Sequence, residues 1–373
     1  MKAPSFLTEA GEEMTEAVKQ DSLLTVNDLK TYFPTDEGVV KAVDGISFNI
    51  NEGATLGVVG ESGCGKSTVG RSILQILDKP GEVEGGEILW RTDSIDGTSM
   101  VIDVAKEKPN SKTMRSIRGQ DIALIFQEPM TSFSPVHTIG NQMIEMVRLH
   151  RDVTKAEAKD RSIELLQSVG IPNPEQRINE YSFQLSGGLR QRAMIAMALS
   201  CDPKLLIADE PTTALDVTTQ AQILDLLRQL QEKNGMAIML ITHNLGVIAE
   251  MADDIVVMYL GRAVESGTVD EVFHNPQHPY TRGLLRSIPS IYGSDVKKLP
   301  SITGSIPHPF NRPAGCTFSP RCPDYIDGTC DVNEPVFQSM EDTSQFVSCF
   351  LHHPPKSVGA SVGATATKEA TGD

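Results

Sequence analysis

The stretch Gly60-Glu-Ser-Gly-Cys-Gly65-Lys66-Ser67 decides the fold of this chain. It fits the pattern G-x-x-x-x-G-K-S/T, and it lies directly between the apolar run Ala54–Val59 and a helical pattern at Lys66–Leu77. Glycines let backbone N–H groups turn inward around phosphate oxygens, and the dipole of the following helix adds to that field. A strand, a glycine-rich loop and a helix in this order predict a nucleotide-phosphate site.

Two side chains of this loop have distinct expected roles. Lys66 is expected to reach the β- and γ-phosphate oxygens, and the Ser67 hydroxyl to ligate Mg²⁺. The other candidate nucleotide-binding residues are Gly60, Ser62, Gly63, Cys64, Gly65 and Thr68. The alternative, a glycine turn with an exposed lysine, would not require the flanking strand and helix.

Outward from the loop, short apolar runs alternate with helical patterns. The runs predicted to be buried strands are Ala54–Val59, Ile122–Phe126, Lys204–Ala208, Ala237–Ile241 and Ile255–Tyr259. The helical patterns are Lys66–Leu77, Thr218–Glu232 and Leu245–Met251. This alternation predicts an α/β fold with a mostly parallel sheet. Residues 136–185 lack a strand-like run and contain a helical pattern at Lys155–Val169, which indicates a helical insertion.

Two acidic residues, Asp209 and Glu210, end the apolar run that begins at Leu205. Many strands end in acidic turns, but downstream of a phosphate loop such a pair has a specific use. The first carboxylate can hold Mg²⁺, usually through water, and the second can orient and polarise the attacking water. Asp209 is therefore a candidate Mg²⁺ ligand and Glu210 a candidate general base.

The segment Leu185-Ser-Gly-Gly-Leu-Arg-Gln-Arg192 resembles the signature sequence of ABC ATPases, LSGGxxQR. Ser186, Gly187 and Gly188 open a helical pattern at Leu189–Leu199, and a helix N-terminus favours an anion. In that family the signature caps the γ-phosphate bound by the opposite subunit, so the resemblance implies that two chains enclose two ATP molecules. It also implies a P-loop NTPase fold with a RecA-like core, an antiparallel β-subdomain and a helical subdomain at about 136–200.

Four further positions match the family in order along the chain. Gln127 resembles the glutamine that senses Mg²⁺, Ala214-Leu215-Asp216 resembles the loop that crosses the dimer interface, and His243 resembles the switch histidine. Phe33, together with Tyr32, occupies the place of the aromatic residue that stacks on adenine. Alone, His243 could be an ordinary strand-end histidine and Phe33 a core residue. The order of the motifs favours the functional roles, least so for Phe33.

Three segments narrow the resemblance to the ATPases of dipeptide and oligopeptide importers. They are His278-Pro-Tyr-Thr-Arg-Gly-Leu-Leu285, Gly315-Cys-Thr-Phe-Ser-Pro-Arg-Cys-Pro323 and Gln127–Pro135. A longer segment, Arg91–Lys112, departs from the family and is expected to form an enlarged surface hairpin. The expected organisation is a tail at 1–20, an ABC ATPase domain at 21–285, a C-terminal module at 286–356 and a disordered tail at 357–373.

Four cysteines in the C-terminal module, Cys316, Cys322, Cys330 and Cys349, suit a metal centre. The module has little apolar sequence of its own, so a metal would help it to fold. The resemblance favours a 4Fe–4S iron–sulfur cluster, while zinc and unliganded thiols stay open as alternatives. Cys64 and Cys201 are expected to be packing residues.

Charge and hydropathy restrict the partners. The net charge of −16 argues against nucleic acid, which requires a basic surface. No run approaches the roughly 20 apolar residues that span a bilayer, and residues 1–20 lack a signal peptide. We therefore expect a peripheral protein at the cytoplasmic face of the membrane.

The resemblance implies an ATP-hydrolysing subunit that energises uptake of di- or oligopeptides. Its implied partners are a second, different ATPase subunit, two transmembrane permease subunits and an extracytoplasmic substrate-binding protein. Nickel or another small cargo, a soluble non-transport ABC ATPase and a degenerate subunit are the alternatives. The presence of Lys66, Asp209, Glu210 and His243 counts against the last of these.

Overall fold

The computed structural model describes residues 22–93, 99–127, 132–213, 215–288 and 302–355. It contains two sheets, and the larger one forms the α/β core. Its strand order is β11-β12-β10-β9-β3-β8-β7-β6. The parallel strands are β9 (Asp254–Tyr259), β3 (Thr55–Val59), β8 (Ala237–Thr242), β7 (Leu205–Asp209) and β6 (Ile122–Ile125). All five predicted strands are present, and the α/β prediction is confirmed.

The edge of this sheet is antiparallel and includes the C-terminal region. β10 (Arg262–Thr268) pairs with β9 on one side and β12 (Phe346–Val347) on the other, and β11 (Gln338–Ser339) pairs with β12. Ser348 N also donates a hydrogen bond of 2.9 Å to Val264 O. The C-terminal region therefore extends the main sheet.

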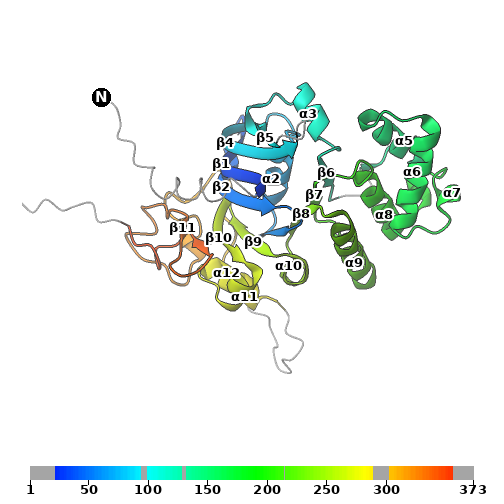
Figure 1. The fold of residues 1–373 in the computed structure, drawn as a ribbon. Coiled ribbons are helices and arrows are strands. Elements are labelled where there is room, and N and C mark those ends of the chain that lie inside the picture. Colours follow the sequence, from blue (N-terminus) through cyan, green and yellow to red (C-terminus); the bar gives the residue numbers. More distant parts are fainter. Residues whose placement is uncertain (1–21, 94–98, 128–131, 214, 289–301, 356–373) are drawn as a thin grey trace, which may run out of the picture.

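The second sheet is antiparallel, in the order β2-β1-β4-β5 (Figure 1). Its strands are β1 (Ser22–Thr35), β2 (Gly38–Asn51), β4 (Glu82–Asp93) and β5 (Ser99–Asp103). Helix α2 (Lys66–Ile73) lies between the two sheets, because its buried Val69 and Ile73 share one apolar cluster with Ile46 of β2 and Ile207 of β7. This packing holds the loop before α2 at the junction of both sheets.

The expected enlarged hairpin at Arg91–Lys112 is partly visible. β4 and β5 pair as far as Asp93 and Ser99, and residues 94–98 lie outside the described part of the chain. A 3-10 turn, η1 (Val104–Lys106), and helix α3 (Lys112–Ile117) follow. Trp90 on β4 is fully buried, so the hairpin is rooted in the core.

The helical insertion forms a separate group to one side of the sheets (Figure 1). Its helices are α5 (Ile139–His150), α6 (Lys155–Ser168), α7 (Pro174–Arg177) and α8 (Gly187–Ala198), with the 3-10 turn η2 (Ser182–Gln184) before α8. Helix α6 begins with a capping box between Thr154 and Glu157, and it buries Leu165 and Leu166 in the main core cluster. These four helices lie where the sequence predicted helices instead of strands.

The remaining helices cover the main sheet and its edge. They are α9 (Val217–Asn234), α10 (Leu245–Met251), α11 (Val269–His274), α12 (Pro279–Arg286) and the 3-10 turn η3 (Ser319–Arg321). Helix α2 ends at Ile73, four residues before its predicted end at Leu77, and Gln75 beyond it has a left-handed backbone with φ +53°. None of the helices among the described residues is long and apolar enough to cross a bilayer.

The predicted tails at 1–20 and 357–373, together with 128–131 and Ala214, lie outside the described residues.

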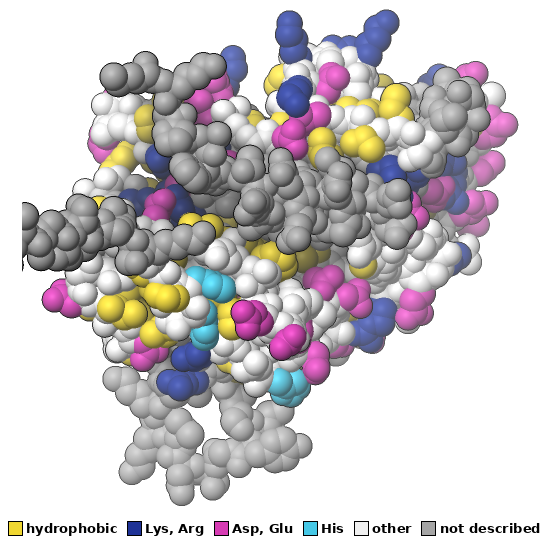
Figure 2. Space-filling model, turned by 60° about the vertical axis from the view of Figure 1, so that its left-hand side comes forward, with side chains coloured by type: hydrophobic (Ala, Val, Ile, Leu, Met, Phe, Trp, Pro, Cys, Tyr) yellow, Lys and Arg dark blue, Asp and Glu magenta, His cyan; other side chains and the backbone are white. Residues whose placement is uncertain are grey.

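On the face shown in Figure 2, acidic and basic side chains are interspersed.

Candidate active site

Two glycines of the phosphate loop, Gly60 and Gly65, lie in places that no side chain can occupy. A Cβ on Gly65 would stand 2.1 Å from Ala42 O, and a Cβ on Gly60 would stand 2.2 Å from Met258 O. Gly63, with φ +79°, has no atom within 4 Å of its Cβ position and faces open space. The loop is therefore pressed against the backbone of β2 and β9 on one side and open on the other.

Lys66 lies inside the curve of this loop. Its side chain is 5% exposed, and Nζ donates hydrogen bonds to Gly60 O at 2.8 Å and to Glu61 O at 3.2 Å. No side chain caps the N-terminus of α2, so its first backbone N–H groups are left for another acceptor. Cys64 packs behind the loop, where burial raises the pKa of its thiol. A buried ammonium beside uncapped N–H groups suits a polyphosphate.

Asp209 and Ser67 come together at the foot of the loop. Ser67 Oγ donates a hydrogen bond of 2.9 Å to Asp209 Oδ1, and the carboxylate is 5% exposed. Burial raises the pKa of Asp209, the hydrogen bond from Ser67 lowers it, and the charge of Glu210 raises it further. A hydroxyl and one carboxylate are hard oxygen donors, and Mg²⁺ takes one or two carboxylates besides substrate phosphates and water. The donor set fits Mg²⁺.

Glu210 is fixed by three neighbours at the end of β7. Oε2 accepts hydrogen bonds from Gln127 Nε2 at 3.0 Å and Thr213 Oγ1 at 2.8 Å, and Oε1 lies 3.0 Å from His243 Nδ1. Burial would raise the pKa of Glu210, but the hydrogen bonds from His243 and Thr213 outweigh it, and the pKa is lowered. The structure thus brings together Glu210, Gln127 and His243, and these contacts favour the ionised form of the carboxylate.

Within one chain, the signature segment contributes no residue to the cavity that opens above the phosphate loop. Ser186 caps α8 by accepting a hydrogen bond from Leu189 N at 3.4 Å, and it is exposed together with Gly187. Asp216 is also exposed, and it caps α9 through Thr219 N at 3.0 Å. The two segments are neighbours, since a Cβ on Gly188 would stand 2.9 Å from Thr219 Cγ2.

A cavity of 260 Å³ opens above the phosphate loop. The residues that line it and that the sequence predicted to belong to the site are Ser62, Gly63, Gly65, Lys66, Ser67, Thr68, Gln127 and Glu210. The remaining lining residues are Val40, Lys41, Ala42, Leu260, Gly261, Pro309 and Arg312. The structure does not bring Phe33 to this cavity. The ring packs over Gly81, where an added Cβ would stand 2.4 Å from Phe33 Cε1.

Two arginines of the C-terminal region reach the site, and sequence reasoning missed both. Arg312 lines the cavity, whereas Arg321 forms a bidentate ion pair with Glu61 of the phosphate loop at 2.6 and 3.0 Å. The side chain of Arg321 is 4% exposed, and it lies one residue before Cys322. Only the fragment Pro-Arg-Cys marked this position in the sequence, and nothing there indicated its partner.

The His278-Pro-Tyr segment has a direct role at the same loop. His278 caps α12 by accepting a hydrogen bond from Tyr280 N at 3.0 Å, and Tyr280 OH accepts one from Glu61 N at 2.9 Å. Tyr280 packs with Tyr259 and Phe318, whose ring centroids lie 4.8 and 5.4 Å away. The segment that resembled a family fingerprint therefore helps to hold the phosphate loop.

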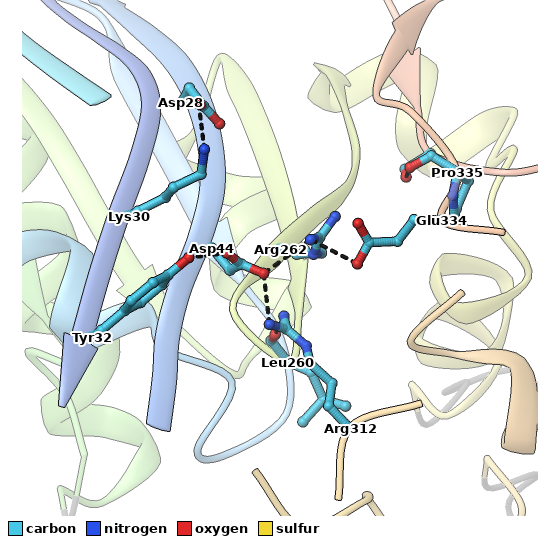
Figure 3. Close-up of polar contacts among 10 residues, drawn as sticks. Asp28, Lys30, Tyr32, Asp44, Leu260, Arg262, Arg312, Glu334 and Pro335 are labelled. Atoms are coloured by element: carbon cyan, nitrogen blue, oxygen red, sulfur yellow. Dashed lines mark hydrogen bonds and ion pairs between the residues drawn. The ribbon is translucent and has the colours of Figure 1, made fainter. Parts of the chain in front are cut away.

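A buried carboxylate, Asp44 on β2, joins three parts of the chain beside the cavity (Figure 3). It accepts hydrogen bonds from Tyr32 OH at 2.5 Å, Arg262 Nη2 at 2.9 Å and Arg312 Nη1 at 2.7 Å. Burial opposes its ionisation, but the Tyr32 hydrogen bond and the two guanidinium groups keep its pKa below the usual value. Arg262 also pairs with Glu334 at 2.8 Å.

The four C-terminal cysteines gather in one region. Cys316 N donates a hydrogen bond of 2.8 Å to Cys330 O, and burial raises the pKa of Cys316 to about 11 and that of Cys322 to about 12. Neighbouring thiols add to both shifts, Cys330 and Cys349 for Cys316, and Cys316 and Cys349 for Cys322. Among the described residues, no three His, Cys, Asp or Glu side chains form a group that could hold a metal ion. This geometry does not support the expected iron–sulfur cluster.

Two family models match the chain. The first, ABC transporter, covers residues 43–213, and the second, oligopeptide/dipeptide transporter C-terminal region, covers residues 264–330. Both the phosphate loop and the first three of the four C-terminal cysteines fall within these matches.

Similar curated proteins cover nearly the same length. The chain is 49% identical over 331 residues to the oligopeptide transport ATP-binding protein AppD of Bacillus subtilis. The aligned residues cover 89% of this chain and 97% of that protein. The chain is 43% identical over 324 residues to the dipeptide transport ATP-binding protein DppD of Escherichia coli, which spans 87% and 95%. A solved dimer of the ATP-binding cassette MJ0796 with ADP and Pi superposes with a TM-score of 0.56 at 25% identity, covering 66% of this chain and 98% of that one.

Proposed function

Because this chain belongs to the family of ATP-binding subunits of oligopeptide and dipeptide ABC transporters, we propose that it hydrolyses ATP to energise peptide uptake across the cytoplasmic membrane. The observation that carries the proposal is the Glu210 carboxylate, held by Gln127 and His243 beside the phosphate loop in contacts that lower its pKa.

Binding of ATP would use the loop as it stands. The Lys66 ammonium would exchange its present carbonyl acceptors for phosphate oxygens, and the uncapped N–H groups of α2 would donate to the same phosphates. Ser67, Asp209 and Gln127 would hold Mg²⁺ with the phosphates. The metal would neutralise charge that develops on the phosphates during transfer.

Hydrolysis would then depend on Glu210. Its carboxylate would accept a hydrogen bond from the attacking water and orient it in line with the γ-phosphate. Gln127 and His243 fix the two carboxylate oxygens and would keep Glu210 aimed at that water. Because the carboxylate is already ionised, it needs no proton loss before it acts.

A second ATPase subunit would complete the site. Ser186 and Gly187 are exposed and lie away from their own chain's cavity, so they are free to meet a phosphate bound by a partner. A solved dimer of a similar cassette supports this arrangement. We favour a hetero-dimer, because the importer ATPases that the sequence resembles usually come as two different subunits.

The permease subunits would dock at an apolar groove of 690 Å³ between β6, α5 and α8. Phe126 and Leu149 line it and are exposed, and Phe126 directly precedes Gln127. Movement of a permease segment in this groove would therefore shift Phe126 and, through the adjacent Gln127, the contacts at the γ-phosphate. A peripheral position at the cytoplasmic face of the membrane follows from such docking.

Peptide-dependent turnover tests this function. The chain would be co-expressed with its genomic neighbours, and the complex reconstituted in vesicles with its substrate-binding protein. We expect ATP hydrolysis and uptake of labelled di- or oligopeptides to rise together. Hydrolysis that responds to nickel but not to any peptide would contradict the peptide cargo, and hydrolysis without membrane subunits or cargo would favour a soluble ATPase.

For the cysteines, we propose that Cys316, Cys322, Cys330 and Cys349 hold a 4Fe–4S cluster, with zinc and free thiols as alternatives. Their mutual influence on pKa supports proximity, and a bound cation would reverse those shifts because it stabilises thiolates. Around them, the described elements are only η3, β11 and β12, which are two or three residues long. A bound metal would therefore contribute a large share of the folding free energy of so small a module.

Metal analysis of protein purified without oxygen separates these alternatives. We expect about four iron atoms and four sulfides per chain, the stoichiometry of such a cluster, and their loss in Cys316→Ser and Cys349→Ser. Cys201→Ser, in a buried cysteine outside the module, should keep the wild-type content. One zinc per chain or no metal at all would overturn the proposal.

A further inference from the structure

We propose that the C-terminal region supplies part of the nucleotide site, and that Arg312 contacts the base and ribose of the bound nucleotide. This inference rests on the proposed ATPase function and deepens it. The region would then act in ATP recognition, besides any role of its cysteines.

The cavity has two chemically different ends. One end is lined by the phosphate loop with Lys66 and Ser67, and by the catalytic candidates Gln127 and Glu210. The rest of the wall comes from β2, the turn after β9 and the C-terminal region, with Val40, Leu260, Pro309 and Arg312. A nucleotide whose phosphates lie at the phosphate loop would place its ribose and base against this remaining part of the wall.

The guanidinium of Arg312 lies in this part of the cavity wall and is held there by two hydrogen bonds. Nη1 donates to Asp44 Oδ2 at 2.7 Å, and Nη2 donates to Leu260 O (Figure 3). Asp44 is 4% exposed and is itself fixed by Tyr32 and Arg262. A guanidinium held along its edge in this way has lost its rotational freedom before a ligand arrives, which reduces the entropic cost of binding.

The guanidinium also has unused binding capacity. Nη1 donates to Asp44 and Nη2 to Leu260, while Nε is buried and has no hydrogen-bond partner among the described residues. The face of the guanidinium plane and the second N–H of each Nη are therefore what it can offer a ligand. Arginine planes stack on aromatic rings, and their N–H groups donate to ribose oxygens. Because Phe33 lies outside the cavity, Arg312 and Pro309 provide the surface that faces the base.

Arg262 offers a matched control for this role. It donates to the same oxygen of Asp44 at 2.9 Å, but it does not line the cavity. If Arg312 only neutralised Asp44, replacing either arginine would have a similar effect. If Arg312 contacts the nucleotide, only its own replacement weakens binding.

The experiment measures dissociation constants for ATP and ADP by calorimetry on the full-length chain, in wild type and in Arg312→Gln, Arg262→Gln and the exposed-site control Arg286→Gln. For Arg312→Gln we expect affinity for both nucleotides to fall about tenfold, the scale of one charged contact. Arg262→Gln and Arg286→Gln should stay within about twofold. Equal losses for ATP and ADP exclude the γ-phosphate, and an unchanged affinity for inorganic tripolyphosphate, which has no base or ribose, then places the contact on the base and ribose.

Three results would overturn the inference. They are unchanged affinity in Arg312→Gln, equal weakening in Arg262→Gln, and a loss confined to ATP, which would place Arg312 at the γ-phosphate. Should Arg312→Gln fail to fold, Arg312→Lys keeps a charge beside Asp44 but lacks the planar fork, and the same affinity loss is expected from it. Failure of the wild-type chain to bind either nucleotide would instead contradict the proposed ATPase function.

Discussion

Replacing Glu210 by glutamine is expected to slow ATP hydrolysis at least about 100-fold while ATP binding is retained, the scale of a positioned general base. Glutamine keeps the size of the side chain and can still contact Gln127 and His243, but its amide cannot accept a proton from water. The measurement is single-turnover hydrolysis beside nucleotide affinity in the reconstituted complex. Because the lowered pKa keeps Glu210 ionised, wild-type turnover should hold as the pH falls from 7 towards the ordinary range of a glutamate.

Glu232→Gln is the matched control, because Glu232 is an exposed glutamate on α9. It should leave both hydrolysis and binding at wild-type values. Near-normal hydrolysis by Glu210→Gln would mean that the partner subunit's site carries the reaction, and that this chain is the regulatory half of the motor.

Removing Arg321 should have the largest effect on stability. Arg321→Met leaves Glu61 without its bidentate partner in a largely buried setting, since Arg321 is 4% exposed and Glu61 24%. We expect a loss of about 3 kcal/mol in the free energy of unfolding, at the low end for a broken buried ion pair because Glu61 keeps some contact with water. Affinity for ATP should fall as well, because Glu61 lies within the phosphate loop. Denaturant unfolding and nucleotide titration measure the two effects.

A double variant separates the ion pair from simple packing. Glu61→Gln with Arg321→Met removes both charges, so most of the lost stability should return. If the double variant is as unstable as the sum of the two single variants, the two residues do not interact, and the coupling between the C-terminal region and the phosphate loop is wrong.

Most of the core could be predicted because its elements are signalled locally. The strand before Gly60, the strand before Asp209 and the helix at Leu245–Met251 each carry their own apolar pattern. Lys66, Ser67 and Glu210 sit within contiguous motifs that follow β3 and β7, and the carboxyl ends of these two parallel strands lie at the same edge of the sheet with only β8 between them. What these predictions share is that each depends on a few successive residues.

The parts that could not be predicted depend on long-range geometry. β11 and β12 are two residues long, too short for a period of two to appear in the sequence. Arg312 and Arg321 come from a proline-rich region that resembled a boundary, and their partners Asp44 and Glu61 lie more than 250 positions earlier. The expected place of Phe33 in the cavity came from the order of motifs alone, while its actual neighbour is Gly81.

The ion pair between Glu61 and Arg321 joins residues 260 positions apart, and this separation has a consequence for biosynthesis. A ribosome makes the phosphate loop early, and Arg312 and Arg321 emerge only when most of the chain has been translated. N-terminal segments begin to fold during synthesis. The α/β core can therefore form before Arg321, the ion-pair partner of Glu61 in the phosphate loop, has been synthesised. A nascent or prematurely terminated chain ending before residue 312 therefore lacks both arginines, and it should not capture ATP as the finished protein does.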